Sequence, residues 1–382
     1  MTGTIDNILG YWLTLKDPRG GFYGEADSAG RIHYDAPRGE ILNARIIWAF
    51  SAAYSALKKT EYLEAAVHAA DYFLRHFCDH KWGGVYWSMD STGERLDTKK
   101  QLYAQGFAIY GLSELYAATH DDAALKEACN LFHVVESKFR DRENGGYTEA
   151  LARDFSPLED MSLSAHDINA EKTMNSHLHI LEAYANLYKV WPDEELKGAV
   201  KELLDIIGTK VKGPDGHLQL YFTRDWKVIP GAVSYGHDIE TSWLMLECAA
   251  ALKDFDVVNR VRPVALELGK AGNEGLLPDG SMLYEKLPDG SIDASRQWWV
   301  QAEAVVGNLW LWKYHACPEG YTNAKAAWDY IREHLIDTEL GEWYWAILPD
   351  GSPDLSQPKA GFWKCPYHNT RMCLEALQIL DF

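Results

Sequence analysis

A glycine followed by one or two aromatic residues recurs along the chain, and this repeat constrains the fold more than any other feature. GGVYWSMD and GEWYWAIL are two of its copies. The six copies begin at Gly20, Gly83, Gly145, Gly216, Gly280 and Gly341. Successive copies start 63, 62, 71, 64 and 61 residues apart. Because self-similarity at a fixed period marks a repeat architecture, the sequence predicts six structural units of nearly equal length.

Each interval contains two helical patterns of different character. One is amphipathic, as in TEYLEAAVHAADYFLRHF, with charged residues on one face and apolar residues at spacings of three and four. The other is apolar nearly all round, as in EILNARIIWAFSAAYSAL and HDIETSWLMLECAAAL. A helix that lacks a polar face must be surrounded by protein. Alternation of the two patterns predicts an all-α (α/α)6 barrel, with six inner helices inside six outer helices.

The glycine-aromatic segments all join an outer helix to the next inner helix, so they should gather at one end of the barrel. Their alternating Val, Tyr and Trp residues favour short β-hairpins there. A cleft is expected at the same end, where the aromatic loops and the starts of the inner helices converge. Length alone would suggest two or three domains, but no linker-like stretch is present. We therefore predict a single barrel domain over residues 1–382.

Composition excludes several classes of partner. The formal net charge of −19 argues against nucleic acid and against anionic membrane surfaces, and it fits a neutral small molecule better than a polyanion. No apolar stretch reaches membrane-spanning length, and the N-terminal MTGTIDNILGYW does not resemble a secretion signal. The six cysteines form no C-x-x-C pair, which is typical of reduced thiols. These features predict a cytoplasmic protein.

Polar residues on the apolar helices are the candidates for function. Arg45 in LNARIIWAF must have a partner or a function if it is buried, and a structural ion pair and a functional role both stay open. In MNSHLHILEAY, His177 and His179 diverge by roughly 200° on a helix, so they cannot chelate one metal together. Asn175, His179 and Glu182 share a face. His177 is expected to serve packing.

Two further inner helices carry carboxylates beside tryptophans. In SYGHDIETSWLM, His237, Glu240 and Trp243 are three residues apart and should point the same way. In WWVQAEAVVG, Trp299 and Glu303 lie four apart on one face. A tryptophan on a buried helix is usually part of the core, whereas a buried glutamate needs a partner. An acid/base pair beside a sugar-stacking ring is one interpretation, and a satisfied histidine on a surface helix is the other.

The stretch FWKCPYHNTRMC places Trp363 and His368 on either side of Pro366, which suits a helix start. His237 lies at a similar position in its own helix. A helix N-terminus disfavours the cationic form of a histidine, so both residues are candidate bases near neutral pH. Phosphate-binding, dinucleotide-binding, H-E-x-x-H and G-x-S-x-G motifs are missing from the sequence. The scattered histidines lack the local spacing of a zinc site, so no metal is expected.

Side by side, these stretches resemble the cellobiose 2-epimerases of the N-acylglucosamine 2-epimerase superfamily. The resemblance runs from GGFYG near the N-terminus to CPYHNTRMC near the C-terminus, and KTMNSHLHILEAY, SYGHDIETSWLM, WWVQAEAVVG and WKCPYHNTRM are its most specific parts. The resemblance implies an (α/α)6 barrel, in agreement with the repeat count. It implies that His237 and His368 move the C2 proton of a sugar and that His179 assists ring opening. Arg45 resembles the arginine that stabilises an enediolate.

The resemblance also supplies the other site residues. Glu240 and Glu303 match carboxylates that the family needs for activity. Asp167 is carried over less securely because its loop varies within the family. The positions that match substrate-binding residues are Tyr103, Asp167, Asn175, Trp243, Trp299 and Trp363.

Chemistry supports those roles independently. Inversion at C2 of an aldose requires ring opening, removal of the proton α to the carbonyl on one face, and delivery of a proton to the other face. Two neutral histidines on opposite inner helices can exchange the roles of base and acid. The intermediate carries negative charge on oxygen, which a buried arginine stabilises. No hydride moves, so neither a nicotinamide nor any other cofactor is expected.

The predicted activity is therefore interconversion of the reducing-end glucose and mannose of β-1,4-linked disaccharides, with cellobiose and lactose as substrates. The close alternatives are an aldose–ketose isomerase acting on mannose and an N-acylglucosamine 2-epimerase. A glycoside hydrolase on the same barrel is more distant, because hydrolases rest on a carboxylate pair. A sugar-binding protein without activity would explain the tryptophans but not three inward histidines and an arginine. A monomer is the default expectation.

Overall fold

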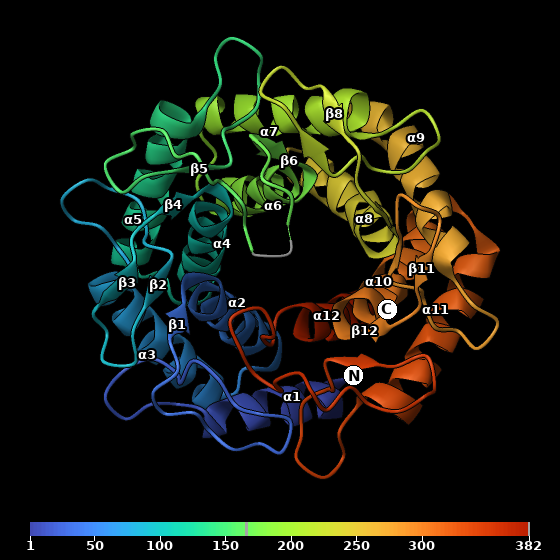
Figure 1. Ribbon diagram of the computed structural model, residues 1–382, viewed down its shortest axis with the longest axis horizontal. Coiled ribbons are helices and arrows are strands. Elements are labelled where there is room, and N and C mark those ends of the chain that lie inside the picture. Colours follow the sequence, from blue (N-terminus) through green and yellow to red (C-terminus); the bar gives the residue numbers. More distant parts are fainter. Residues whose placement is uncertain (165–166, 381–382) are drawn as a thin grey trace.

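The computed structural model describes residues 1–164 and 167–380, and in these residues twelve α-helices form two concentric rings (Figure 1). The outer helices are α1 (Thr2–Thr14), α3 (Thr60–His76), α5 (Asp122–Val134), α7 (Glu194–Ile206), α9 (Phe255–Gly272) and α11 (Pro318–Tyr330). The inner helices are α2 (Glu40–Leu57), α4 (Leu102–Thr119), α6 (Met174–Val190), α8 (Tyr235–Ala251), α10 (Trp298–His315) and α12 (His368–Leu380). The predicted (α/α)6 barrel is confirmed.

Burial separates the two rings as their sequence patterns predict. Each inner helix packs against the next one along the chain, and α12 packs against α2 to close the ring. On α2 every residue from Glu40 to Ala53 is buried, whereas α7 buries one face and exposes the other. Three outer helices continue into a π-helical turn, namely η1 (Val135–Phe139), η2 (Ile207–Val211) and η4 (Ile331–Leu335), and α9 continues into the 3-10 turn η3 (Asn273–Gly275). Among the described helices, none is both long and apolar enough to cross a membrane.

The two ends of the barrel differ in the length of their connections. At one end, each inner helix turns into the next outer helix within two or three residues. Lys58, His120 and Ala316 end α2, α4 and α10 in the left-handed conformation, which reverses the chain tightly. At the other end, long segments lead from each outer helix to the next inner helix. Those segments contain the glycine-aromatic repeats and all strands of the described residues.

Strand pairing at this end links neighbouring units. A two-residue strand directly precedes five of the inner helices: β1 (Arg38–Gly39), β4 (Lys100–Gln101), β6 (Lys172–Thr173), β9 (Val233–Ser234) and β12 (Arg296–Gln297). Each pairs antiparallel with a strand of the following unit, respectively β2 (Ser88–Met89), β5 (Ala150–Leu151), β7 (Tyr221–Phe222), β10 (Glu285–Lys286) and β13 (Ala346–Ile347). β3 (Arg95–Asp97), β8 (Val228–Ile229) and β11 (Ile292–Asp293) complete hairpins. A bridge between Ala26 and Ala360 links the first and last units. The hairpins were expected, whereas the pairing between units required the tertiary structure.

Buried ion pairs and glycines hold the repeated turns in place. A cation just before an inner helix pairs with an aspartate of the glycine turn in Arg38–Asp17, Lys100–Asp79 and Lys172–Asp141, and Lys359 in the loop before α12 pairs with Asp337. In GGYTEA, Gly146 has a φ of +74°, and a Cβ there would lie 2.7 Å from Nε2 of His177. His177 itself accepts the backbone N–H of Tyr147 at 3.0 Å and contacts the carbonyl of Thr173 at 2.7 Å. Its burial, which lowers the pKa to about 4, and these contacts agree with the predicted packing role.

Candidate active site

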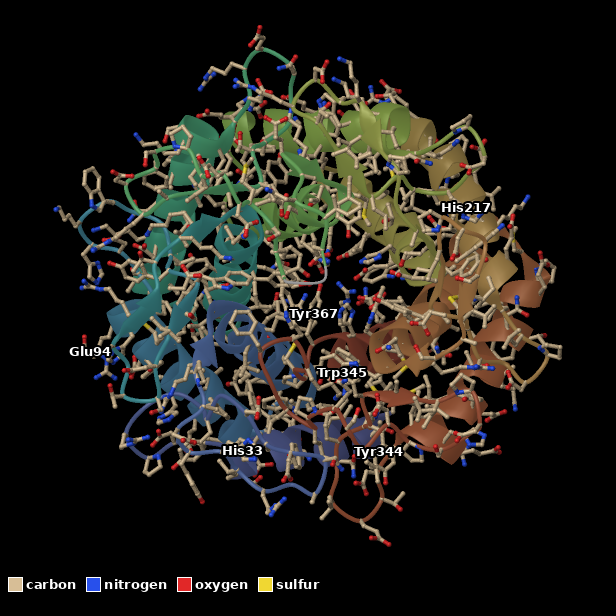
Figure 2. All side chains as sticks on the ribbon, in the orientation of Figure 1. His33, Glu94, His217, Tyr344, Trp345 and Tyr367 are labelled. Carbon is tan, nitrogen blue, oxygen red and sulfur yellow. The ribbon has the colours of Figure 1, made fainter. Side chains whose placement is uncertain are left out.

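A cavity of about 650 Å³ opens at the end of the barrel that carries the strands. Side chains fill the rest of the ring interior, and Figure 2 shows Tyr367 and Trp345 near the centre while Glu94 and His33 lie at the periphery. Ten of the twelve predicted site residues line the cavity: Arg45, Tyr103, Asp167, Asn175, His179, His237, Glu240, Trp299, Trp363 and His368. Residues from all six inner helices and from two long loops are thus brought together.

The other two predicted residues, Trp243 and Glu303, lie behind the cavity wall. Glu303 is fully buried, and its Oε1 lies 2.8 Å from Nδ1 of His368. Trp243 is 1% exposed, and its indole N–H donates to Oε2 of Glu303 at 2.9 Å. The expectation that Trp243 stacks on a sugar needs correction, because one further helical turn from Glu240 places the indole below the cavity. Trp243 instead positions Glu303.

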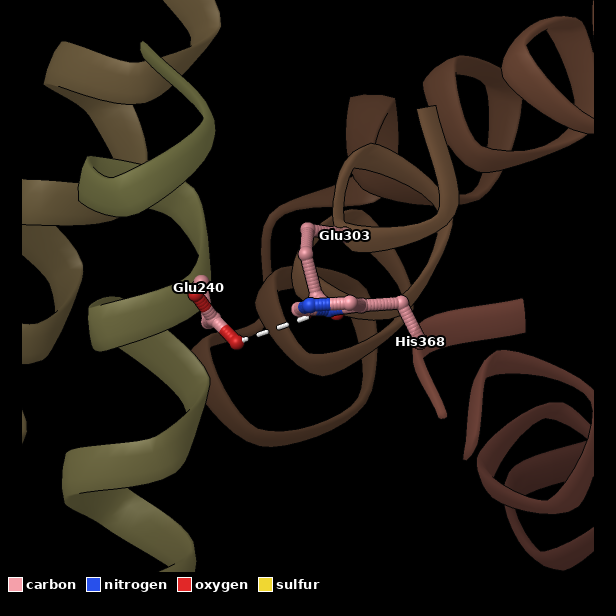
Figure 3. A group of neighbouring side chains, drawn as sticks. All are labelled: Glu240, Glu303 and His368. Atoms are coloured by element: carbon pink, nitrogen blue, oxygen red, sulfur yellow. Dashed lines mark hydrogen bonds and ion pairs between the residues drawn. The ribbon is translucent and has the colours of Figure 1, made fainter. Parts of the chain in front are cut away.

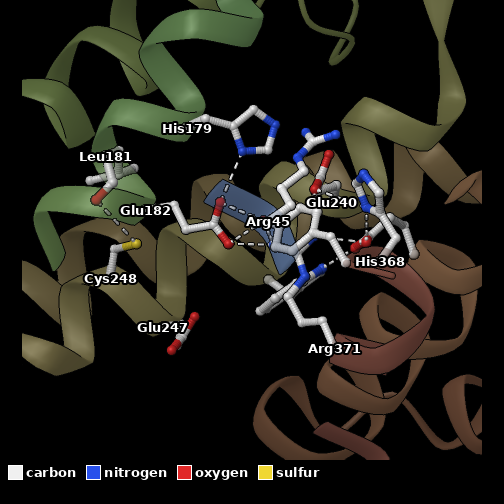
Figure 4. Close-up of polar contacts among 12 residues, drawn as sticks. Arg45, His179, Leu181, Glu182, Glu240, Glu247, Cys248, His368 and Arg371 are labelled. Carbon is white, nitrogen blue, oxygen red and sulfur yellow. Dashed lines mark hydrogen bonds and ion pairs between the residues drawn. The ribbon is translucent and has the colours of Figure 1, made fainter. Parts of the chain in front are cut away.

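His179 on α6 is held from below by a carboxylate. Its Nδ1 lies 2.9 Å from Oε2 of Glu182, three residues further along the helix, as the shared face predicted (Figure 4). Glu182 also accepts the hydroxyl of Tyr367 at 2.5 Å and an N–H of Arg371. The ring of Tyr103 meets the imidazole edge-on at 5.2 Å. These contacts fix the ring so that its Nε2 is the nitrogen left for the cavity.

His368 is the first residue of α12 and is also held by carboxylates. Figure 3 shows its ring beside Glu303 and Glu240, whose nearest oxygens lie 2.8 Å and 3.8 Å from Nδ1. Glu303 Oε1 accepts a second hydrogen bond from Nη2 of Arg371 at 2.8 Å. The neutral tautomer that this geometry favours carries its proton on Nδ1, which leaves the Nε2 lone pair free to act as a base.

His237 on α8 has a different anchor. Its Nδ1 lies 2.8 Å from the hydroxyl oxygen of Ser234, and its ring centroid is 4.7 Å from that of Trp299. The indole also lies 5.6 Å from the ring of His368. Gly236 permits this packing, since a Cβ there would lie 2.7 Å from the Trp299 ring. The helices of the two histidines are not opposite each other as expected: α10 lies between them, and its Trp299 contacts both rings.

All three cavity histidines favour the neutral form. Burial lowers the pKa of His237 to about 3, with the nearby His179 acting in the same direction. Burial, followed by the positive charges of Arg371 and Arg45, holds the pKa of His368 well below its ordinary value. Burial likewise lowers the pKa of His179, although Glu182 opposes the shift. The predicted neutral state agrees with these directions, but enclosure and neighbouring cations cause it more than the helix termini do.

Arg45 decides between the two interpretations that the sequence left open. Its Nη2 donates to the hydroxyl of Tyr103 at 2.7 Å, and the guanidinium lies 4.1 Å from the ring centroid of Phe107. Within the described residues no carboxylate lies within 4.0 Å of it, so the structural ion pair does not form there. Although burial opposes the charge, Tyr103 and Cys365 hold the pKa of Arg45 above its ordinary value. A full positive charge therefore faces the cavity without a neutralising partner among the described side chains.

A second buried arginine organises three carboxylates below the cavity. Arg371 contacts Glu182, and its Nη2 lies 2.6 Å from Glu240 and 2.8 Å from Glu303 (Figure 4). Burial raises the pKa of both Glu240 and Glu303, each of which is close to the other carboxylates. Against its own burial, Glu182 has its pKa lowered by Arg371 and His179. Glu182 is thus the ionised partner of Arg371, and Glu240 readily carries a proton at neutral pH.

The same group is the one place in the described chain where three potential metal ligands converge. Ligand atoms of Glu240, Glu303 and His368 lie within 4.8 Å of one another. The guanidinium of Arg371 already supplies a positive charge to both carboxylates. A divalent ion would have to compete with it, so the donor set fits a metal poorly.

The cavity mouth is polar and aromatic. Asp167 accepts hydrogen bonds from Tyr221 at 3.1 Å and from Ser164 at 2.5 Å. Trp363 packs beside Trp87 with ring centroids 5.9 Å apart. Buried Oδ1 of Asn175 has no hydrogen-bond partner within residues 1–164 and 167–380, so it is free to accept one from a bound molecule. Indole faces and free acceptors are suited to the C–H groups and hydroxyls of a sugar.

Sequence reasoning missed several residues of this site. Arg371 and Tyr367 were not singled out, although an arginine on an otherwise apolar helix was the signal that revealed Arg45. Ser234 and Glu285 have no such signal, because a serine and a glutamate in a short hairpin are ordinary surface residues. Ser234 lies only three residues before His237, whereas Glu285 comes close to Ser234 through pairing between units, which the local sequence does not encode.

Comparisons with known proteins find relatives along nearly the whole chain. The sequence profile of the N-acylglucosamine 2-epimerase (GlcNAc 2-epimerase) family matches residues 21–371. A cellobiose 2-epimerase of Bacteroides fragilis is 48% identical over 374 residues, covering 97% of this chain and 95% of that protein. A cellobiose 2-epimerase of Ruminococcus albus is 37% identical over 375 residues, covering 97% and 96%.

A solved structure of cellobiose 2-epimerase from Bacillus thermoamylovorans superposes with a TM-score of 0.94 at 38% identity, covering 99% of this chain and all of that one. Its fold is therefore the fold seen here along the whole length. The chain belongs to the N-acylglucosamine 2-epimerase family, whose members are carbohydrate epimerases and isomerases.

Proposed function

We propose that the protein interconverts the reducing-end glucose and mannose of β-1,4-linked disaccharides, cellobiose to glucosyl-mannose and lactose to epilactose. The observation that carries the proposal is one cavity in which three neutral histidines surround an arginine that has no carboxylate partner among the described residues. Proton transfer beside a developing oxyanion requires this combination. The cellobiose 2-epimerases that the chain resembles support the disaccharide substrate.

Ring opening comes first, because C2 becomes acidic only when C1 is a carbonyl. Opening removes the proton of the anomeric hydroxyl and returns a proton to the ring oxygen. His179 is assigned to this step, since Glu182 fixes its Nδ1 and leaves Nε2 for the sugar. Glu240 is suited to donate a hydrogen bond here, because its raised pKa keeps it protonated and its Oε2 has no partner in the described part of the chain.

The C2 proton is then exchanged between two faces. One of His237 and His368 removes the proton through Nε2, while the C2–H electron pair forms the C1–C2 double bond and charge moves to O1. The other histidine delivers a proton to the opposite face of C2. The reverse reaction exchanges their roles, so neither histidine is solely an acid or a base. Trp299, which contacts both imidazole rings, holds their relative positions.

The enediolate is stabilised by the positive charge at Arg45. Because the guanidinium has no carboxylate partner among the described side chains, its field is available to the oxygen of the intermediate. A donor of this kind contributes about 10²- to 10³-fold to the rate in comparable oxyanion sites. The reaction transfers protons only, and the residues described here are sufficient to move them.

Proton NMR of the EDTA-treated protein with cellobiose in D2O tests the proposal. Glucosyl-mannose with deuterium at C2 is the expected product, because the returning proton comes from a histidine that exchanges with solvent. Inactivity towards cellobiose with turnover of mannose or N-acetylglucosamine would assign a monosaccharide substrate instead. Release of free glucose would contradict the proposal outright, since hydrolysis breaks the glycosidic bond that epimerisation leaves intact.

A further inference from the structure

Ser234 occupies a position where its hydroxyl would normally cap a helix, but the hydroxyl contacts His237 instead. It is the N-cap residue of α8, is 1% exposed, and makes no side-chain capping hydrogen bond. Its hydroxyl oxygen instead lies 2.8 Å from Nδ1 of His237, three residues on. Serine is favoured at N-caps because it satisfies free backbone N–H groups. Here that interaction is replaced by one with the imidazole.

The pairing of β9 with β10 brings a carboxylate to the same hydroxyl. Ser234 and Glu285 are directly opposite in the antiparallel register, so their side chains lie on one face of the sheet. This register places the Glu285 carboxyl group beside the Ser234 hydroxyl, and the hydroxyl acts to lower the pKa of Glu285 against the effect of burial. His237, Ser234 and Glu285 therefore follow one another from the cavity to its rim, where Glu285 also lines the wall.

We propose that Ser234 and Glu285 form a proton relay for His237, with Ser234 as the positioning residue and Glu285 as the group that receives and returns the proton. The inference rests on the proposed C2 proton transfer and deepens it. It accounts for a difficulty in that mechanism, namely how a deeply enclosed histidine acts as a base without retaining a positive charge.

The proton movements of the relay balance. In the resting arrangement, Nδ1–H of His237 donates to the Ser234 hydroxyl oxygen, and the hydroxyl proton points to the Glu285 carboxylate. When Nε2 takes the C2 proton, the Nδ1 proton passes to the Ser234 oxygen and the Ser234 proton passes to Glu285. The imidazole ends neutral with its proton on Nε2, and Glu285 ends as the carboxylic acid. The reverse sequence lets His237 return a proton to C2.

The surroundings of His237 and of Glu285, the two ends of the relay, fit a transfer of protons between them. An enclosed imidazolium is disfavoured, as the lowered pKa of His237 shows, so transfer of the second proton avoids the unfavourable charge. His179 and Glu303 are the charged or titratable groups that act on the ring of His237. At the other end, burial and then Asp293 raise the pKa of Glu285 to about 7, with Asp167 acting in the same direction. A carboxylate of this kind can gain and lose a proton near neutral pH.

Kinetics of four variants test the relay in the full-length protein. Ser234→Ala and Glu285→Gln should each lower kcat by about 10²-fold and leave KM within about twofold, because the residues act through His237. The decrease in kcat of the double variant should be no larger than that of either single variant, because either substitution alone already interrupts the relay. Ser234→Thr retains the hydroxyl and should recover most of the activity. Losses that multiply in the double variant would overturn the relay.

Two matched controls come from the turn of the same hairpin. Ser291 and Asp289 are exposed, and the Asp289 carboxylate accepts hydrogen bonds from the hydroxyl and the backbone N–H of Ser291. Ser291→Ala and Asp289→Asn should leave kcat and KM unchanged. If they cause the same loss as Ser234→Ala and Glu285→Gln, the hairpin matters only as structure and the relay is wrong.

A readout independent of turnover separates this inference from the proposed function. Nitrogen-15 shifts of the His237 imidazole, assigned with the His237→Gln variant, report which ring nitrogen carries the proton. In the wild type the proton should move from Nδ1 to Nε2 as the pH falls through about 7, when Glu285 becomes a donor. Glu285→Gln should abolish this change. If the His237 tautomer does not change with pH across this range, the relay is wrong even if cellobiose is epimerised. If the tautomer changes as expected but cellobiose is not epimerised, the relay stands and the proposed substrate is wrong.

Discussion

The surroundings of His368 and His237 differ although the two rings face one cavity and both favour the neutral form. His368 contacts the carboxylate of Glu303 directly, and that carboxylate is bonded by Arg371 and Trp243. His237 contacts the hydroxyl of Ser234, and Glu285 lies opposite Ser234 in the neighbouring strand. A positive charge on His368 would lie 2.8 Å from a carboxyl oxygen of Glu303, whereas Nδ1 of His237 contacts a neutral hydroxyl.

This difference shows that two histidines can exchange protons with opposite faces of C2 without having the same hydrogen-bond partners. On the His368 side, the carboxyl group of Glu303 can stabilise the imidazolium in place. On the His237 side, the geometry favours moving the second proton away. Trp299 touches both rings and belongs to neither arrangement, so changes on one side can be made without rebuilding the other.

The largest effect should come from removing either ring. His237→Ala and His368→Ala should each lower epimerisation by about 10³- to 10⁴-fold in both directions, because each direction needs one base and one acid. Each variant should still exchange the C2 proton of one epimer with D2O, since the remaining histidine can remove and return a proton on its own face. The two variants should exchange opposite epimers. NMR of purified cellobiose and glucosyl-mannose in D2O measures this exchange.

His33→Ala is the control for these substitutions, because His33 is a half-exposed ring at the periphery that pairs with Glu25 (Figure 2). It should retain wild-type rates. If both cavity variants exchanged the same epimer, the two rings would lie on one face of the sugar and the two-sided mechanism would be wrong.

A smaller effect should follow from altering only the anchor of His368. Glu303→Gln keeps the shape of the side chain but removes the charge that balances the imidazolium, and its amide can offer a donor to Nδ1. We expect kcat to fall by about 10²- to 10³-fold, more than for Glu285→Gln, because the lost contact is direct and charge-assisted. Steady-state kinetics of the two variants under identical conditions measure the difference.

Glu247→Gln provides the matched control, since Glu247 lies on α8 and pairs with Lys189 at 2.8 Å on the barrel surface. Its rates should match the wild type. If Glu303→Gln and Glu285→Gln lowered kcat equally, a carboxylate in direct contact with a histidine would have no larger effect than one that acts through Ser234.

The sequence was sufficient to predict the fold because the helical periodicity and the glycine repeat are local signals that agree six times over. The helix of EILNARIIWAFSAAYSAL is buried all round from Glu40 to Ala53, as its lack of a polar face requires. The same reasoning found Arg45 and His179, since a polar group on such a helix has few places to point. Depth along a helix was harder to predict. Trp243 shares a face with His237 but lies two turns deeper, and a helical face does not reveal where the cavity floor lies.

Of the contacts that hold the histidines, only those within one helix could be predicted from the sequence. Glu182 lies three residues from His179 on one helix, so spacing alone revealed that pair. Glu303 and His368 lie on α10 and α12, and Ser234 and Glu285 on separate strands, so their contacts depend on how the units pack. The buried helix pattern and the family resemblance both singled out Glu303, whereas nothing in the local sequence connects Glu285 with His237.

The smallest predicted effect is a shift in the pH dependence of kcat/KM, and it concerns only the groups next to His237. Asp293 is directly opposite Glu285 in the β10–β11 pair, and its negative charge raises the pKa of Glu285. Asp293→Asn should therefore lower that pKa, because the ionised form of Glu285 loses a repulsive neighbour. Glu285 must be ionised to accept the relayed proton, so kcat/KM should fall as the pH drops through its pKa.

In Asp293→Asn this fall should move to lower pH by roughly half a unit to one unit, while the rate at pH 8 changes little. A kcat/KM profile between pH 5 and 9 for the wild type, Asp293→Asn and Glu285→Gln measures the shift. Glu285→Gln should lack the same step at any pH, because its amide does not titrate. A step that stays in place in Asp293→Asn would have to come from another group, and the carboxylates beside His368 would then be the ones that set the acidic limit.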